Sequence, residues 1–132
     1  MMMQFFTPLH FMAVGLGAAV GAWLRWMLAV WLNQPGNAMP WGTLAANLVG
    51  GYLVGLAFGF FSTLPALPPF WRLFLITGLL GGLTTFSTFS AETVAFLEEG
   101  RIAAAALYSG VSLLGSLALT FLGLMTVQTL RG

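Results

Sequence analysis

Polar side chains that could handle an ion are concentrated in an apolar stretch of this chain. Between Gly78 and Ser90, two adjacent glycines, Gly81 and Gly82, precede a run of Thr and Ser residues. Such residues disfavour a continuous helix. A helix break at membrane depth frees carbonyls and amides, which is tolerated only where they are buried in protein or face an ion or water. Unwound carbonyls are oxygen ligands for cations. A kinked, continuous helix is the alternative, and the density of hydroxyl residues favours the break.

Two phenylalanines follow these glycines. Phe86 and Phe89 are three residues apart and therefore share one helical face. Phenylalanines in apolar helices are usually core filler or face lipid. Here they are flanked by Ser and Thr rather than by Leu, and the edge of an aromatic ring is electropositive. Rings presented edge-on could stabilise a dehydrated anion.

A second pattern of hydroxyl groups lies near the C-terminus. Its members recur at a spacing of four residues: Tyr108, Ser112, Ser116 and Thr120. The series covers about 18 Å of helix at 1.5 Å per residue. A single Ser or Thr often only bonds the preceding turn of its own helix. Four in register favour a polar pathway.

One amide and two charges fall inside apolar segments. Asn47 could bond a neighbouring helix or donate to an anion. Arg25 could extend its charge to the membrane surface or attract anions into a water-filled vestibule. Glu92 could pair with Arg25 or remain separate. Ionisable groups are expensive within a membrane, so both are candidate functional residues.

The composition of the chain limits the functions that these residues can have. The 132 residues are 59% hydrophobic and 5% charged, with no Cys and one His, and the mean hydropathy is +0.96. Soluble domains carry about a quarter charged residues, so we expect lipid to be the solvent for most of this surface. There is no nucleophile–base pair for an enzyme and no basic run for a nucleic acid.

The predicted fold class is an all-α membrane protein with four transmembrane helices in a single domain, residues 1–132. A bilayer core of about 30 Å requires roughly 20 apolar residues as a helix. Turn-forming and charged residues separate four such segments, at about 9–32, 41–61, 70–97 and 102–130. The predicted break falls in the third segment.

Charge does not select an orientation in the membrane. With four spans, Arg72 and Arg131 share one side, while Arg25 and Arg101 lie towards the other. The Lys/Arg bias that normally sets topology is therefore absent. Either helix hydrophobicity sets a single orientation, or copies insert both ways and pair as an antiparallel, dual-topology homodimer.

Three motifs in this order resemble those of the CrcB/Fluc fluoride channels, over essentially the whole chain. The residues that carry the resemblance are Gly17-Ala18-Ala19-Val20-Gly21-Ala22-Trp23-Leu24-Arg25-Trp26, Gly42-Thr43-Leu44-Ala45-Ala46-Asn47 and Gly81-Gly82-Leu83-Thr84-Thr85-Phe86-Ser87-Thr88-Phe89. The third motif is the most specific.

The resemblance implies a passive, fluoride-selective channel that relieves fluoride toxicity from the inner membrane of a bacterium. It implies an antiparallel homodimer with two pores and a structural sodium ion held by the carbonyls of Gly81 and Thr84. Arg25 would be the vestibule arginine. The fluoride pathway would comprise Asn47, Phe86, Phe89, Tyr108, Ser112, Ser116 and Thr120.

Two other classes of membrane protein compete with this interpretation. A proton-coupled small multidrug transporter also has four helices, but it would need a carboxylate in the first helix, and the first segment has none. A non-transporting scaffold has little need for the polar series near the C-terminus. Both are weaker hypotheses than a channel.

Overall fold

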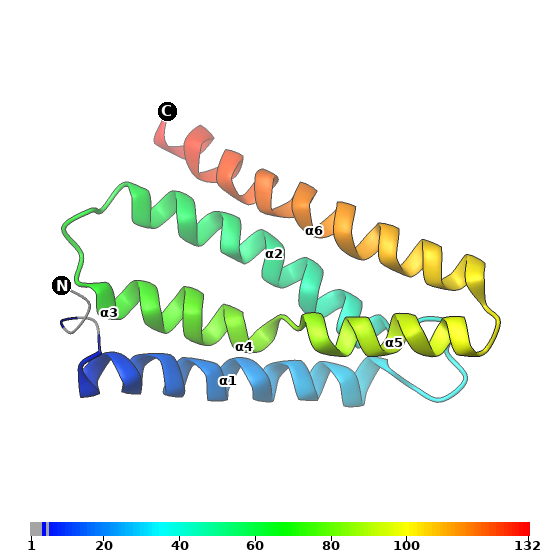
Figure 1. The fold of residues 1–132 in the computed structure, drawn as a ribbon. Helices are drawn as coiled ribbons and strands as arrows, with labels where there is room; N and C mark the ends of the chain where they lie inside the picture. The colour runs from blue at the N-terminus through cyan, green and yellow to red at the C-terminus, as the bar shows by residue number, and fades with distance from the viewer. Residues whose placement is uncertain (1–3, 5) are drawn as a thin grey trace.

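All regular structure in the described part of the chain is helical. The computed structural model describes residue 4 and residues 6–132. The elements follow one another as α1 (Pro8–Leu32), α2 (Trp41–Ser62), α3 (Pro69–Arg72), η2 (Leu73–Leu80), α4 (Gly81–Leu83), α5 (Phe86–Glu98) and α6 (Ile102–Arg131). Figure 1 shows them as an elongated array in which the start of α1, the C-terminus and the α2–α3 loop lie at one end.

Within the described residues, four helical spans are long and apolar enough to cross a membrane, as the sequence predicted. They are Pro8–Leu32, Trp41–Ser62, Pro69–Glu98 and Ile102–Arg131. Their bounds differ from the expected ones by a single residue at most. The third span is composite, because α3, η2, α4 and α5 follow one another within it.

Local sequence explains where the helices begin and turn. The Thr7 hydroxyl accepts a hydrogen bond from the His10 amide at 3.2 Å, and Pro8 occupies the first turn of α1; both features stabilise a helix start. Gly100 joins α5 to α6 with a φ of +76°, a conformation that a residue with a Cβ adopts only at a cost.

Close backbone contacts hold the helices in two pairs. α2 packs on α6 and α1 packs on η2 and α4. A Cβ added to Gly55 would collide with the Thr120 carbonyl, and one added to Gly21 would collide with the Leu79 carbonyl. These glycines therefore let helix backbones approach closely. Small residues do the same in other membrane helices, where burial of apolar surface drives little association.

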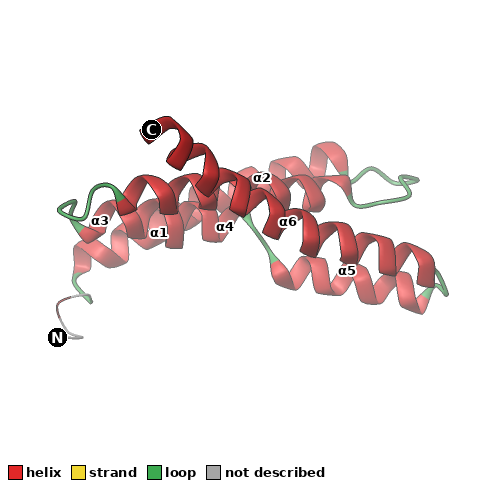
Figure 2. Ribbon diagram, turned by 90° about the horizontal axis from the view of Figure 1, so that it is seen from above, coloured by secondary structure: helices red, strands yellow, loops and turns green. Residues whose placement is uncertain are grey.

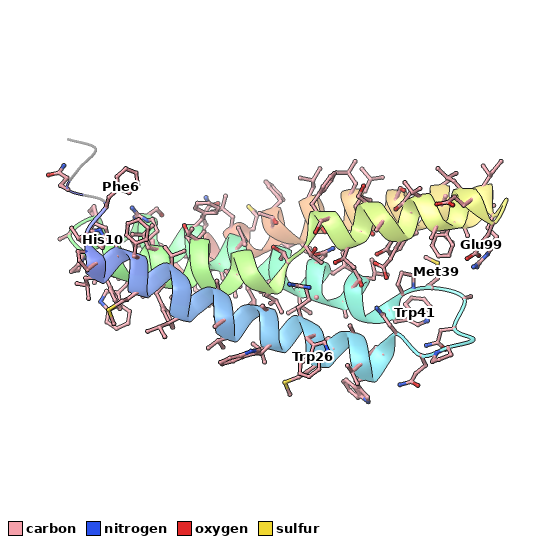
Figure 3. The ribbon with its side chains drawn as sticks, turned by 60° about the horizontal axis from the view of Figure 1, so that its bottom comes forward. Phe6, His10, Trp26, Met39, Trp41 and Glu99 are labelled. Atoms are coloured by element: carbon pink, nitrogen blue, oxygen red, sulfur yellow. The ribbon has the colours of Figure 1, made fainter. Side chains whose placement is uncertain are left out.

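The outer faces of these helices are apolar. Trp26 is 65% exposed and Phe86 is 79% exposed, and Figure 3 shows Trp26 pointing away from the neighbouring helices. Only small buried clusters, such as Ala46 with Leu80 and Leu83, lie between the helices. A surface of this kind needs lipid or another apolar surface around it.

The third span contains two departures from α-helical geometry. η2 is an eight-residue π-helix, a rare form that is frequently found at functional sites and that the sequence did not predict. The second departure is the unwound segment between α4 and α5, visible in Figure 2 where α5 leaves the path of α4 and continues beside α6. This segment positions the candidate site.

Candidate functional site: a cavity at the helix break

The break consists of two threonines with extended backbones. Thr84 has φ −86° and ψ 153°, and Thr85 has φ −148° and ψ 119°. β-branched residues tolerate this conformation well. The Thr84 amide and hydroxyl both donate to the Leu80 carbonyl, at 3.0 and 2.9 Å. The Thr85 hydroxyl accepts from the Thr88 amide at 3.1 Å and so caps α5.

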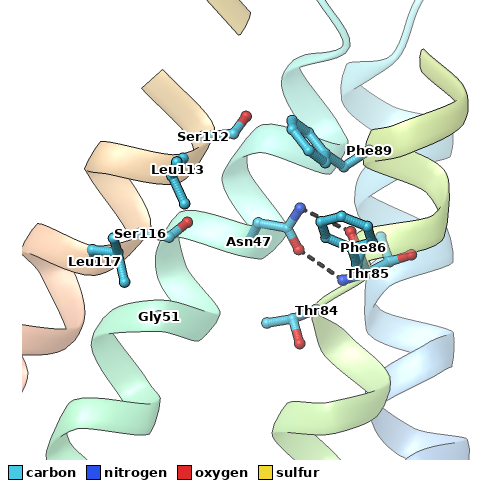
Figure 4. Close-up of a pocket in the computed structure, with 10 residues that line it drawn as sticks. All are labelled: Asn47, Gly51, Thr84, Thr85, Phe86, Phe89, Ser112, Leu113, Ser116 and Leu117. Atoms are coloured by element: carbon cyan, nitrogen blue, oxygen red, sulfur yellow. Dashed lines mark hydrogen bonds between the residues drawn. The ribbon is translucent and has the colours of Figure 1, made fainter. Parts of the chain in front are cut away.

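Asn47 clamps the unwound backbone from α2. Its Nδ2 donates to the Thr85 carbonyl at 3.1 Å, and its Oδ1 accepts from the Thr85 amide at 2.7 Å; both bonds are drawn in Figure 4. Unpaired peptide groups at membrane depth cost several kcal/mol each. The Asn47 amide thus replaces the helical partners that Thr85 lacks, and one of its two Nδ2 hydrogens remains for another acceptor.

A cavity of about 300 Å³ lies beside this clamp. Figure 4 shows how α2, α6 and the two sides of the break contribute its walls. It brings together most of the predicted site residues: Asn47, Thr84, Phe86, Phe89, Ser112 and Ser116. Gly51 and Thr85 also line it, and the sequence analysis had not assigned them to the site.

The two phenylalanine rings form one wall. Their centroids are 5.7 Å apart and their planes are tilted by 53°. Phe89 also contacts the Tyr108 ring, with a centroid separation of 5.4 Å. The shared face expected from their spacing is present. Phe86 is largely exposed in a single chain, whereas Tyr108 is fully buried.

The four hydroxyl groups of α6 have different partners. Ser112 and Ser116 line the cavity. The Ser112 hydroxyl is buried and has no hydrogen-bond partner among the described residues. Thr120 donates to the Gly51 carbonyl at 2.8 Å, and Tyr108 donates to Glu92 Oε1 at 3.1 Å. The middle pair is therefore available to a ligand, and the outer pair bonds to the protein.

Arg25 is bound at the break. Its Nε donates to the Gly82 carbonyl at 3.0 Å, near the C-terminal end of the half-helix formed by η2 and α4. A cation is favourable there because helix C-termini carry partial negative charge. Arg25 does not pair with Glu92, so of the two alternatives that the sequence left open, the charges remain separate. It lies close to the break but does not line the cavity.

Glu92 belongs to a separate polar network. Its Oε2 accepts from the Thr43 hydroxyl at 3.3 Å, while its Oε1 accepts from Tyr108. Asn33 donates to the Thr43 hydroxyl at 3.3 Å and accepts from the Gly42 amide at 2.6 Å. Sequence reasoning missed Thr43 and Asn33, which lie near the ends of apolar segments, Asn33 at the start of a polar turn. The network ties α1, α2, α5 and α6 together at one end.

Two carbonyls at the break accept no hydrogen bond from the described residues. The carbonyl oxygens of Leu80, Gly82 and Thr85 all accept hydrogen bonds. Among the described residues, no amide or hydroxyl donates to the carbonyl of Gly81 or Thr84. Free carbonyls at a helix break fit the oxygen coordination that sodium requires. These two are the carbonyls to which the family resemblance assigns a structural sodium ion.

Comparison with known proteins shows which family the sequence matches. Residues 12–124 match the family described as CrcB-like protein, Camphor Resistance (CrcB). The chain is 59% identical to a "Fluoride-specific ion channel FluC" of Bordetella bronchiseptica over 125 residues, covering 95% of this chain and 96% of that protein. It is 61% identical to a protein of the same name from Ralstonia pickettii over 123 residues, covering 93% and 98%.

The clamp predicts a specific loss when its donor is removed. In Asn47→Asp the acceptor oxygen remains, but a carboxylate faces the Thr85 carbonyl and no N–H pairs with it. An unsatisfied buried group costs about 1–3 kcal/mol, so we expect a lower melting temperature in detergent and faster hydrogen exchange at Thr85. Asn37→Asp, which removes an exposed loop amide that donates to the Leu32 carbonyl, is the control. Equal melting of both variants and the parent would contradict the clamp.

Proposed function

This chain belongs to the CrcB-like family, and on that premise we propose that it is a channel through which fluoride crosses the membrane passively. With four spans and this family membership it is a multi-pass membrane protein and not an enzyme. The names of its relatives supply the identity of the ion. The cavity at the helix break supplies a location for it.

The single observation that carries the proposal is the buried Ser112 hydroxyl. It lines the cavity and has no partner among the described residues. Buried polar groups are nearly always hydrogen-bonded, and leaving one unpaired costs about 1–3 kcal/mol. An anion in the cavity would accept this hydrogen bond. Small anions need such donors because they leave their water behind on entering.

We infer a path formed by weak donors in sequence. Asn47, Phe86, Phe89, Ser112 and Ser116 all line the same cavity, where the remaining N–H of Asn47, the ring edges and the two hydroxyls would act as the donors. Distributed weak donors suit conduction, because an ion held too strongly would not leave. Tyr108 and Thr120 would bound this path, since their hydroxyls already bond to Glu92 and Gly51.

Arg25 would supply the positive potential that draws fluoride to the path. Its guanidinium lies at the break, bonded through Nε to the Gly82 carbonyl, within a span where no other charge pairs with it among the described residues. A positive charge with low-dielectric walls raises the local concentration of anions. This is the vestibule role that the sequence resemblance implied.

A second copy of the chain would complete the site. Phe86, although it lines the cavity, is 79% exposed, and at the break the described residues of one chain offer sodium the two free carbonyls of Gly81 and Thr84. An antiparallel homodimer would bring a second such pair to a shared axis and cover the rings. The balanced distribution of Arg residues permits both orientations in the membrane. Sodium bound there would add a fixed positive charge between the two copies.

The proposed setting is the inner membrane of a bacterium, surrounded by lipid. Relatives of the same name come from bacteria, and the outer faces of the helices are apolar. A passive path would discharge accumulated fluoride down its gradient without energy input. This would relieve fluoride toxicity.

Fluoride efflux from liposomes tests the proposed function. Purified protein reconstituted in liposomes loaded with fluoride should release it rapidly, whereas liposomes loaded with chloride should retain their contents. No release of either anion by a folded protein would contradict the channel. Proton-driven drug uptake by the same liposomes would then favour the multidrug-transporter class.

The rings can be tested one at a time. Phe86→Ile and Phe89→Ile keep an apolar side chain but remove the electropositive ring edge. We expect each variant to lose most fluoride efflux while its size-exclusion profile is unchanged. Phe60→Ile, which alters a half-exposed ring of α2 that does not line the cavity, is the matched control. Full efflux by both site variants would refute the role of the rings.

The assembly can be tested through sodium. Replacing sodium by a bulky organic cation should shift the protein from dimer to monomer, because the Gly81 and Thr84 carbonyls would lose their shared ligand. A dimer fraction that does not respond to sodium would contradict the shared site.

The orientation in the membrane can be tested with a cysteine introduced by Gly132→Cys in this cysteine-free chain. This cysteine should be labelled from both sides of the membrane, whereas labelling from one side only would exclude dual topology.

A further inference from the structure

The Arg25 side chain is connected to the break through its Nε atom. This atom donates to the Gly82 carbonyl at 3.0 Å. The side chain is half-buried, and among the described residues no carboxylate pairs with it. A guanidinium carries five N–H donors, and the other four meet no acceptor in the described part of the chain. The bond to the break therefore depends on one particular atom of the guanidinium.

Backbone contacts fix where Arg25 lies relative to Gly82. Gly21 and Arg25 are four residues apart and share one face of α1. A Cβ added to Gly21 would collide with the Leu79 carbonyl, and one added to Gly82 would collide with the Ala18 carbonyl. α1 and the half-helix of η2 and α4 thus contact each other through backbone atoms, and this contact places the Arg25 side chain at the break.

The Gly82 carbonyl lies in sequence between the two carbonyls that fit sodium. Those of Gly81 and Thr84 accept no hydrogen bond from the described residues. The Leu80 carbonyl, by contrast, accepts from both the amide and the hydroxyl of Thr84. Arg25 and Thr84 therefore occupy the neighbouring carbonyls and leave those of Gly81 and Thr84 to an ion.

The backbone at this point needs a restraint. Gly81 and Gly82 lack a Cβ, and glycine adopts a wider range of φ and ψ than other residues. If the Gly82 carbonyl had no partner, its peptide group could turn and move the carbonyls on either side of it. An ion site requires ligands that are held in place beforehand. The bond from Arg25 restricts the one peptide group that joins the two halves of the site.

We propose that Arg25 is a positioning residue for the sodium site, because its Nε fixes the Gly82 carbonyl and thereby holds the carbonyls of Gly81 and Thr84 where they bind the ion. The inference rests on the proposed function, to which the sodium site belongs. It gives Arg25 a role that depends on a donor atom, in addition to attracting anions through its charge. Charge alone would act in the opposite sense, since a guanidinium repels a nearby sodium ion.

Two substitutions of Arg25 separate the donor from the charge. Arg25→Lys keeps the charge, but lysine has a methylene group where arginine has Nε. Arg25→Gln removes the charge, but its amide nitrogen lies the same number of bonds from Cα as Nε does. The readout is the sodium concentration that half-saturates the rise in melting temperature of the purified protein, with a bulky organic cation keeping the ionic strength constant.

We expect the half-saturating sodium concentration to be about tenfold higher in Arg25→Lys than in the parent, a ratio that corresponds to about 1.4 kcal/mol. In Arg25→Gln it should not rise, because the N–H donor is retained. Arg25→Met lacks both the donor and the charge. It should weaken sodium binding about as much as Arg25→Lys does, and it keeps the test valid if the lysine variant does not fold.

Arg72→Lys and Arg72→Gln are the matched controls. The Arg72 guanidinium lies 5.7 Å from the centre of the Phe61 ring, and the residue ends α3 at the start of the third span, away from the break. The same two changes of donor and charge are therefore made at a distance from the sodium site. Both variants should bind sodium as the parent does.

The outcomes separate positioning from packing and from charge. If Arg25→Lys lowered the melting temperature but left the half-saturating sodium concentration unchanged, the bond would only pack the helices and the positioning role would be wrong. Tighter sodium binding by Arg25→Met would also overturn it, since repulsion by the charge would then dominate. Weaker binding by Arg25→Gln, to the same extent as by Arg25→Met, would show that the donor is not what matters.

The same measurements separate the positioning role from the channel. A parent whose melting temperature does not respond to sodium would overturn the positioning role together with the sodium site, even if that protein releases fluoride from liposomes. A parent that binds sodium more tightly than Arg25→Lys but shows no fluoride efflux would support the positioning role and contradict the channel.

Discussion

The two hydrogen bonds between Asn47 and Thr85 are the constraint on which the site depends. They satisfy both polar groups of a residue that has left helical geometry at membrane depth. Without them the third span would gain by closing into a continuous helix, because unpaired backbone groups in lipid are so costly. The clamp comes from α2, which in turn packs on α6 through Gly51 and Gly55. The position of the break is thus set by contacts outside its own helix.

Holding the break open separates two opposite partial charges. The half-helix of η2 and α4 ends in carbonyls, and Arg25 bonds one of them at Gly82. α5 starts in amides, those of Phe86 and Ser87. Helix ends carry partial charges of opposite sign, so the two sides of the break differ in the sign of their partial charge.

The sequence predicted the elements better than the partners of its polar groups. The Gly81-Gly82 pair with its threonines indicated the break. The hydroxyl series of α6 was less predictable. At 3.6 residues per turn, a spacing of four drifts by about 40° per step, so Tyr108 and Thr120 face different neighbours. Which acceptor each one meets depends on where Glu92 and Gly51 are placed by packing, and single-chain periodicity does not contain that information. The π-helical turn of η2 has no sequence signal of this kind either.

The difference between the bonded outer hydroxyls of α6 and its unbonded middle ones has a physical consequence for an ion. Because Tyr108 donates to Glu92 and Thr120 donates to Gly51, the outer hydroxyls are already satisfied, and the unpaired donor of Ser112 lies between them. Unsatisfied donors are therefore concentrated at the depth of the break, where a bare ion would otherwise be least stable. At the ends of the proposed path an anion would keep its water and would need no protein donor. The groups that would replace its water thus lie where the water would have to be given up.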